Sequence, residues 1–402
     1  MDIYRWLRIC FFNLLLVASL GVLLRYKIAF SFPLIIQKNV LHSHSHFAFS
    51  GWITQCLMVL MVYYLSTQQL NNTFTRYKPI LVLNLLSAYG MLITFILQGY
   101  AFASISFSTL SIFTSYTFAW FYWRDINRLQ GENYSRLWFK AALVFNVLSS
   151  IGAFALAIIM ANKIASDKLS LSSIYYYLHF QYNGWFFFTC MGLFFSKIKL
   201  KQSALTSKIF WLFAVACLPA YFLSILWAAI HPLLYWGVVL ASLAQTFAWL
   251  LFLRLIHLNK EIIMQAFTKN ARRLLLLSIL ACSIKISLQL LSVIPYLSTL
   301  AFGFRPIVIA YLHLVLLGVI TLFLVGSIIS SKSVRANKGS LVGIGVFVAG
   351  IFLNELFLMV QGVGAITDIM IPNLNVVLFF VALIMFSGIL TLNLSLKRAN
   401  DL

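Results

Sequence analysis

Long apolar runs alternate with short polar segments along the whole chain of 402 residues. A helix of about 20 apolar residues is long enough to cross the hydrocarbon core of a bilayer. The pattern therefore predicts an all-α polytopic membrane protein, in which residues 1–402 form a single integral membrane domain. Its twelve transmembrane helices are expected at residues 9–32, 46–65, 79–101, 103–123, 137–160, 173–196, 209–229, 232–256, 273–293, 305–327, 340–362 and 373–396. A cleaved signal peptide is the alternative for the first run, because Arg5 and Arg8 precede it.

Three histidines recur at a nearly constant interval within these runs. His46, His179 and His313 are separated by 133 and 134 residues, and each is followed five residues later by a glycine: Gly51, Gly184 and Gly318. An unpaired imidazole is costly in a lipid-spanning segment, so a repeated one indicates a repeated role. The interval predicts three pseudo-symmetric four-helix units, at about 1–135, 136–268 and 269–402, with the histidines on the second, sixth and tenth helices.

Composition supports the membrane assignment, and the charge predicts an orientation. The chain is 62% hydrophobic and 9% charged, with a net charge of +21. Most of the 29 basic residues fall in alternate connecting segments, which fits the positive-inside rule with both termini cytoplasmic. The exceptions are Lys285 within a span and, on the outer side, Arg25, Lys27, Lys38, Lys163, Lys168 and Arg305. We therefore expect a bilayer as the partner, the bacterial inner membrane as the location, and no nucleic acid.

The five cysteines occur singly in or beside apolar runs, without a Cys-x-x-Cys pair. This pattern does not support a disulfide scaffold, a zinc site or covalent attachment of a c-type haem. Small packing residues are the simplest interpretation.

A cluster of histidines opens the second run, in the segment His42-Ser43-His44-Ser45-His46. If this segment is helical, His42 and His46 lie one turn apart on one face and His44 is turned away. A neutral imidazole is a good ligand for iron, copper or zinc. The cluster therefore predicts at least one metal ligand, and the alternative is a hydrated helix start that tolerates polar residues.

Three further histidines are candidate ligands. His313 has apolar neighbours on both sides, so a buried partner must satisfy its imidazole, and iron is the partner we expect. His179 lies among aromatic residues and is either a ligand or a core histidine that donates to a backbone carbonyl. His231 precedes Pro232 and is either a ligand or an ordinary loop residue.

These segments together resemble the haem–copper oxidase subunit I superfamily, including its nitric oxide reductase branch. The segment around His313 is similar to that family's tenth-helix motif, His-x-His-Leu-x-x-x-Gly, and the segment around His179 resembles the reductase motif His-x-x-x-Glu-Gly on the sixth helix. The segment from His42 to Trp52 is similar to the ligand region of the second helix. His231 stands where the histidine pair of the seventh helix is expected.

The resemblance implies a low-spin haem with two axial histidines. These would be His313 and either His46 or His42, and Arg305 would lie near the haem propionates. The repeat favours His46, whereas the spacing of the family motif permits His42. The resemblance also implies a copper ion, for which His179 and His231 are the ligands present.

The sequence departs from the family at the reactive centre. Tyr311 replaces one of the two tenth-helix histidines, Asn183 replaces the sixth-helix carboxylate, and Pro232 follows His231 in place of a second histidine. The binuclear centre is therefore depleted. These departures also resemble NnrS-type membrane haem–copper proteins, which are linked to nitric oxide stress.

Two ionisable residues within predicted spans are functional candidates by default. Glu355 could supply protons or simply bond a neighbouring helix, and Lys285 could extend its amine toward the cytoplasmic surface. We take Tyr311 and Glu355 as the candidate catalytic residues.

The expected function is that of a membrane haem-binding redox protein. It would reduce O2 or NO as an oxidoreductase or, as an NnrS-like protein, respond to nitric oxide without turnover. The alternatives are a transporter of haem or metal and a scaffold without a cofactor. An external electron donor or a companion subunit is expected, because no segment is long and polar enough for a cytochrome domain.

Overall fold

The computed structural model describes residues 2–68, 72–130, 134–198, 200, 202–228, 230–331 and 333–399. These residues are almost entirely helical, and the helices group into two compact units. The first unit contains Met1–Phe118 and Leu324–Leu402, and the second contains Ala119–Phe323. The boundaries fall within α5 (Phe102–Arg128) and α15 (Leu322–Ile329).

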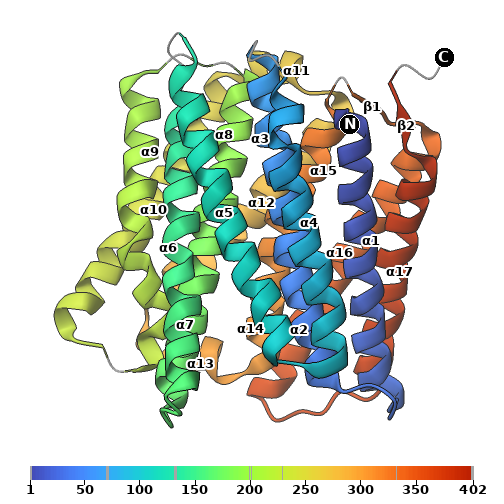
Figure 1. Ribbon diagram of the computed structural model, residues 1–402. Helices are drawn as coiled ribbons and strands as arrows, with labels where there is room; N and C mark the ends of the chain where they lie inside the picture. Colours follow the sequence, from blue (N-terminus) through green and yellow to red (C-terminus); the bar gives the residue numbers. More distant parts are fainter. Residues whose placement is uncertain are drawn as a thin grey trace. The chain divides into compact units, whose positions relative to one another are not determined.

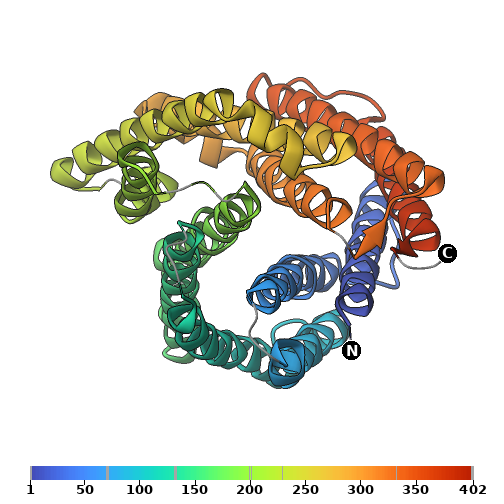
Figure 2. The same cartoon turned by 90° about the horizontal axis from the view of Figure 1, so that it is seen from above.

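The first unit brings the two ends of the chain together. Its other elements are α1 (Ile3–Phe30), α2 (Gln37–Phe47), η1 (Ala48–Thr54), α3 (Gln55–Thr67), α4 (Thr73–Gln98), β1 (Val334–Arg335), α16 (Lys338–Ile366), α17 (Leu374–Ser395) and β2 (Lys397–Arg398). α17 packs against both α1 and α16, and α2 packs against α4 (Figures 1 and 2). Gly343 and Gly388 allow α16 and α17 to approach closely, because a Cβ atom on Gly343 would lie 2.7 Å from the carbonyl oxygen of Gly388.

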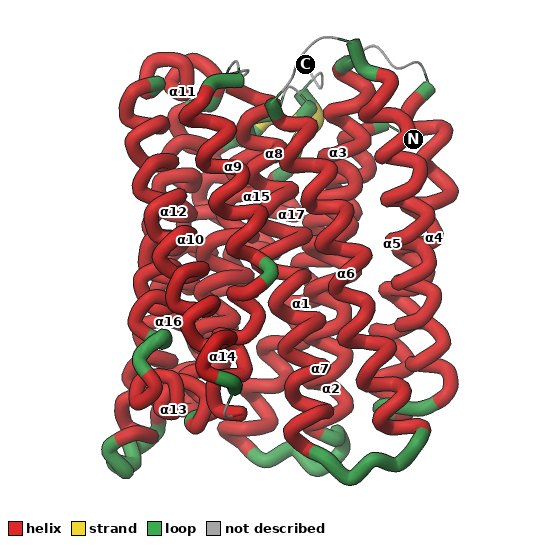
Figure 3. Tube along the Cα trace, turned by 90° about the vertical axis from the view of Figure 1, so that its left-hand side faces the viewer, coloured by secondary structure: helices red, strands yellow, loops and turns green. Residues whose placement is uncertain are grey.

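The second unit contains the histidines at 179, 231 and 313. Its elements are α6 (Ser135–Ala161), α7 (Asp167–His179), η2 (Phe180–Phe186), α8 (Phe187–Ile198), α9 (Ala204–Cys217), η3 (Pro219–Ala228), α10 (Pro232–Leu258), α11 (Lys260–Ala266), α12 (Lys269–Leu291), α13 (Pro295–Gly303), α14 (Arg305–His313) and η4 (Leu314–Thr321). α6 packs against α7, η2 and α8, whereas α12 packs against η4. Within each unit the long helices run roughly side by side, with the loops at their ends (Figure 3).

The helices confirm a polytopic membrane protein. Within the described residues, ten helices are long and apolar enough to cross a membrane. The predicted spans 103–123 and 173–196 are also helical, as α5 and as the continuous helix α7–η2–α8, but neither is among the ten. Serine and threonine lower the hydropathy of the first, and polar residues such as Gln181 and Asn183 lower that of the second. The number twelve therefore remains a prediction.

Local signals explain where several helices begin. Pro232, Pro295 and Pro306 stand in the first turns of α10, α13 and α14, where proline's missing N–H costs no helical hydrogen bond. Ser203 and Thr206 form a capping box at the start of α9. Each signal fixes the residue at which its helix begins.

Candidate functional site

A π-helical segment follows each of the three repeated histidines. η2 begins directly after His179, η4 begins directly after His313, and η1 begins two residues after His46. Each segment contains the glycine of its His-x4-Gly motif. π-Helical turns are rare and concentrate at functional sites. Three of them at the same place in the motif indicate that the motif has a structural consequence, which the sequence pattern did not predict.

Side chains from neighbouring helices bond the backbone of η1. The Asn13 amide of α1 donates to the carbonyl oxygen of Gly51 at 2.5 Å, and the Asn84 amide of α4 donates to that of Ser50 at 3.1 Å. The Tyr89 hydroxyl in turn donates to the Asn13 side-chain oxygen at 2.6 Å. Backbone carbonyls inside a membrane must find a partner within the protein, and these amides provide it.

The other two π segments have the same kind of support. In η2 the Cys217 thiol approaches the carbonyl oxygen of Asn183 at 3.9 Å, and in η4 the Ser278 hydroxyl donates to that of Val319 at 2.7 Å. Cys217 lies 133 residues after Asn84, and Asn183 lies 133 residues after Ser50, the interval that separates His46 from His179. The contact between Asn84 and Ser50 therefore recurs at the same sequence interval.

The motif glycines of the second unit allow helices to pack closely. A Cβ atom on Gly184 would lie 2.5 Å from the Cβ of Phe145 on α6. A Cβ atom on Gly318 would lie 3.1 Å from the Cβ of Ala281 on α12. Real Cβ atoms rarely come this close, so glycine is required at Gly184 and favoured at Gly318.

His42 and His46 lie on one face of α2, as predicted. Both imidazoles contact Phe95 and Tyr100: His46 stacks on Phe95 with ring centroids 4.4 Å apart, and His42 meets Tyr100 edge-on at 4.6 Å. The Nε2 atom of His46 shares a hydrogen bond of 3.0 Å with the Tyr100 hydroxyl. Desolvation raises the pKa of the Tyr100 phenol, so it remains a neutral hydroxyl.

The two remaining imidazoles of the cluster differ in their partners. The Nε2 atom of His42 is buried and has no hydrogen-bond partner among the residues that the structure describes. His44 turns toward α1, where its Nδ1 atom lies 3.1 Å from the carbonyl oxygen of Val17. A carbonyl can only accept, so His44 donates from Nδ1. The cluster thus presents His42 and His46 on one side of α2 and His44 on another.

Hydrogen bonds engage both ring nitrogens of His179. Its Nε2 atom lies 2.8 Å from the carbonyl oxygen of Cys217, and its Nδ1 atom lies 3.1 Å from the side-chain nitrogen of Asn183. Since the carbonyl accepts, Nε2 carries the proton and Nδ1 accepts from the Asn183 amide. The ring is 1% exposed. A metal ion at His179 would have to break one of these bonds.

His231 has a different role at the start of α10. It is exposed, and its Nδ1 atom accepts a hydrogen bond of 3.3 Å from the backbone N–H of Leu233. His231 and His179 share no hydrogen bond or ring contact in the described part of the chain. A copper ion held by this pair would have to replace a hydrogen bond of His179.

His313 bonds the backbone of its own helix through Nδ1. Its Nδ1 atom lies 2.8 Å from the carbonyl oxygen of Ile309, one turn earlier on α14, so Nδ1 carries the proton. The lone pair then resides on Nε2, the nitrogen that commonly binds metal when Nδ1–H bonds a backbone carbonyl. The local geometry of His313 therefore fits an imidazole ligand to haem iron.

The other predicted site residues lie on α14 and α16. The Tyr311 ring lies 6.3 Å from the ring of buried Tyr182. Arg305 is exposed at the first position of α14. Glu355 is partly buried on α16, where the Asn354 side-chain amide donates to its carboxylate at 3.2 Å.

Several contact residues of the site were missed from the sequence. Tyr100 lies in a loop that had no motif, and Cys217 was interpreted as a packing residue. Asn13 could have been found, because Asn13, Asn146 and Ser278 occupy the first helices of the three predicted units at intervals of 133 and 132 residues.

No group of three or more histidine, cysteine, aspartate or glutamate side chains in the described ranges is arranged to hold a metal ion. No family model matches the chain, and no curated protein matches it.

Proposed function

We propose that this membrane protein binds haem as a redox protein resembling haem–copper oxidase subunit I. The axial imidazoles would be His313 and either His42 or His46. Bound haem would supply one-electron redox chemistry, and the buried apolar surroundings would tune its potential.

The observation that carries this proposal is the state of the imidazole nitrogens. Nδ1 of His313 donates to a backbone carbonyl and directs the lone pair to Nε2. Nε2 of His42 is buried without a partner among the rings of Phe95 and Tyr100. A buried polar atom without a partner is costly, and a bound group is one way to satisfy it. On this criterion His42 is a better candidate than His46, which shares a hydrogen bond with Tyr100.

We propose that the chain lacks the copper ion of the family. His179 uses both ring nitrogens in hydrogen bonds within the protein, and His231 uses Nδ1 to cap α10, so the reactive centre would be depleted. This favours electron transfer or an NnrS-like response to nitric oxide over turnover of O2 or NO. Tyr311 and Glu355 remain the candidate catalytic residues if there is turnover, and an external electron donor or companion subunit would supply the electrons.

The proposed architecture is a threefold repeat of four-helix units within twelve transmembrane helices. The π segments after His46, His179 and His313 and their recurring side-chain partners support it. With the basic residues on the inner side, both termini would be cytoplasmic and the histidine ends of the second, sixth and tenth helices would be external. The proposed location is the bacterial inner membrane.

A metal carrier based on the histidine cluster has less support. Such a carrier would need His42, His44 and His46 to converge, but His44 faces α1 while the other two face α4.

The test is haem content and spectra of protein purified in detergent from haem-sufficient cells. Pyridine haemochrome analysis should find haem, and the reduced spectrum should have a sharp low-spin α band. His313→Ala should lose this band, because it removes one axial nitrogen. His231→Ala is the matched control: it removes an exposed imidazole from the same unit and should keep the band. Protein without haem, or an unchanged band in His313→Ala, would contradict the proposal.

A further inference from the structure

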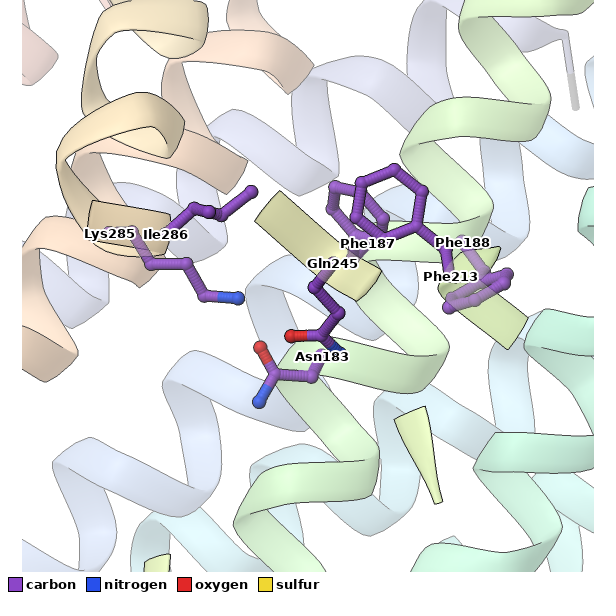
Figure 4. Close-up of a pocket in the computed structure, with 7 residues that line it drawn as sticks. All are labelled: Asn183, Phe187, Phe188, Phe213, Gln245, Lys285 and Ile286. Carbon is purple, nitrogen blue, oxygen red and sulfur yellow. The ribbon is translucent and has the colours of Figure 1, made fainter. Parts of the chain in front are cut away.

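A buried lysine faces a small polar cavity inside the second unit. Lys285 of α12 is 9% exposed, and its cavity is also lined by Asn183 of η2, Gln245 of α10 and the rings of Phe187, Phe188 and Phe213. The Lys285 amine points toward the side-chain amides of Asn183 and Gln245, whose oxygens lie on the side of the amine (Figure 4). A polar site thus lies within an apolar helix bundle.

Lys285 has no acidic partner. Within the described residues its amine forms no ion pair and no hydrogen bond, and the side chains that interact with it electrostatically include the thiols of Cys217 and Cys282 and the imidazole of His179. A lysine amine in a membrane interior costs several kcal/mol unless polar groups or water surround it. Its surroundings must therefore compensate for this cost.

The orientation of Asn183 is fixed by the hydrogen bonds of His179. The carbonyl of Cys217 requires a proton on Nε2 of His179, so Nδ1 accepts, and the nitrogen of the Asn183 side chain must donate to it. The Asn183 side-chain oxygen consequently points elsewhere, and it is buried with no hydrogen-bond partner. The cavity thus contains an unsatisfied donor, Lys285, and an unsatisfied acceptor, Asn183.

The size of the cavity matches one water molecule. It offers about 10 Å³ to the centre of a water, and roughly 10–15 Å³ is needed to hold one. A buried water typically makes about three hydrogen bonds to polar groups that otherwise lack partners. Lys285 can donate to such a water, which can in turn donate to the oxygens of Asn183 and Gln245.

We propose that this cavity is a binding site for one water molecule, held by Lys285, Asn183 and Gln245. The water completes a hydrogen-bonded chain from Lys285 through Asn183 and His179 to the backbone of Cys217. The ligand must accept from an amine and donate to amide oxygens. A halide ion cannot donate, and the charge of Lys285 would repel a copper ion. The site therefore selects water over both ions.

The test is a structure of the full-length protein at a resolution that shows water, determined for the wild type and for Lys285→Met. The wild type should show one density peak within hydrogen-bonding distance of the Lys285 amine and the Asn183 oxygen. Lys285→Met should lose that peak, because methionine cannot donate. Lys208→Met is the control: Lys208 lies outside the cavity with its amine over the Phe247 ring, and its replacement should leave the peak in place.

A parallel structure in bromide separates water from an anion. The proposal expects no anomalous bromide peak in the cavity. It is overturned by such a peak, by an empty wild-type cavity, or by a direct bond between Lys285 and Asn183. If Lys285→Met does not fold, Lys285→Gln preserves an N–H donor and should keep the water, and the wild-type map alone still decides the proposal.

Discussion

The histidines of α2 and of α7 are left in opposite chemical states, although His46 and His179 belong to the same repeated motif. In the first unit, Nε2 of His42 has no partner and Nε2 of His46 bonds only a tyrosine hydroxyl. In the second unit, both nitrogens of His179 are held by a carbonyl and an amide. A shared motif therefore fixes the local helix geometry without fixing the chemistry. The neighbouring residues decide whether an imidazole can bind a ligand or serves as a packing element.

We expect the largest difference in stability between a variant that replaces His179 and a variant that replaces His42. His179→Phe would leave the carbonyl of Cys217 and the amide of Asn183 without their partner, and each unsatisfied buried group costs about 1–3 kcal/mol. His42→Phe should cost much less, because Nε2 of His42 has no hydrogen bond to lose. Thermal unfolding of the two purified variants in the same detergent measures the difference. Equal losses of stability would show that the two histidines do not differ in this way.

Replacing the motif glycines by alanine should lower the stability of the protein by different amounts. Gly184→Ala would place a Cβ atom 2.5 Å from the Cβ of Phe145, and overpacking of this kind costs about 1–3 kcal/mol. Gly318→Ala meets Ala281 at 3.1 Å and should cost less. Gly237→Ala is the control, since its Cβ atom would meet nothing within 4 Å. The midpoint of unfolding should be lowest for Gly184→Ala, higher for Gly318→Ala and highest for Gly237→Ala. A Gly184→Ala protein as stable as Gly237→Ala would contradict the close packing of α6 against η2.

The side chains that bond the π segments should contribute smaller amounts. Asn13→Leu loses the bond to Gly51 and the bond from Tyr89, and interhelical hydrogen bonds in membranes average about 0.6 kcal/mol and reach about 1.7 kcal/mol. Ser278→Ala loses one bond, to Val319, and should cost about half as much. Denaturation in mixed micelles should rank the two variants in this order. The reverse order would mean that η1 does not depend on Asn13.

Much of the fold could be predicted from the sequence, because apolar length is a direct signal for a membrane helix. The predicted spans all coincide with helices, although two of these are less apolar than the rest. The face shared by His42 and His46 was also predictable, since it follows from 3.6 residues per turn. The π segments were not predictable, because an i+5 hydrogen bond leaves no pattern in residue hydrophobicity.

The candidate site was predictable only in part. Residue type and spacing identified His42, His179 and His313, but the state of each imidazole depends on residues far away in the sequence. His179 is held by a backbone carbonyl 38 residues later, and His46 by a tyrosine 54 residues later. No local pattern encodes such partners. The cavity at Lys285 likewise requires residues from α10, α12 and η2 to meet.

The smallest effect concerns the tyrosine next to His46. Tyr100→Phe removes one hydrogen bond and leaves the ring contacts, so it should cost at most about 1 kcal/mol of stability. It would also leave Nε2 of His46 without its hydrogen-bond partner, as Nε2 of His42 is. If His46 then binds the ligand in place of His42, a Tyr100→Phe/His42→Ala double variant should recover spectral features that His42→Ala alone lacks. No recovery would show that His46 is not an alternative ligand.

The most direct test of the difference between the two regions is the reduced-minus-oxidised spectrum of His42→Ala and of His179→Asn, each normalised to the amount of folded protein. The imidazole states predict that the low-spin α band is lost in His42→Ala and kept in His179→Asn. A band that survives in His42→Ala and disappears in His179→Asn would contradict the account.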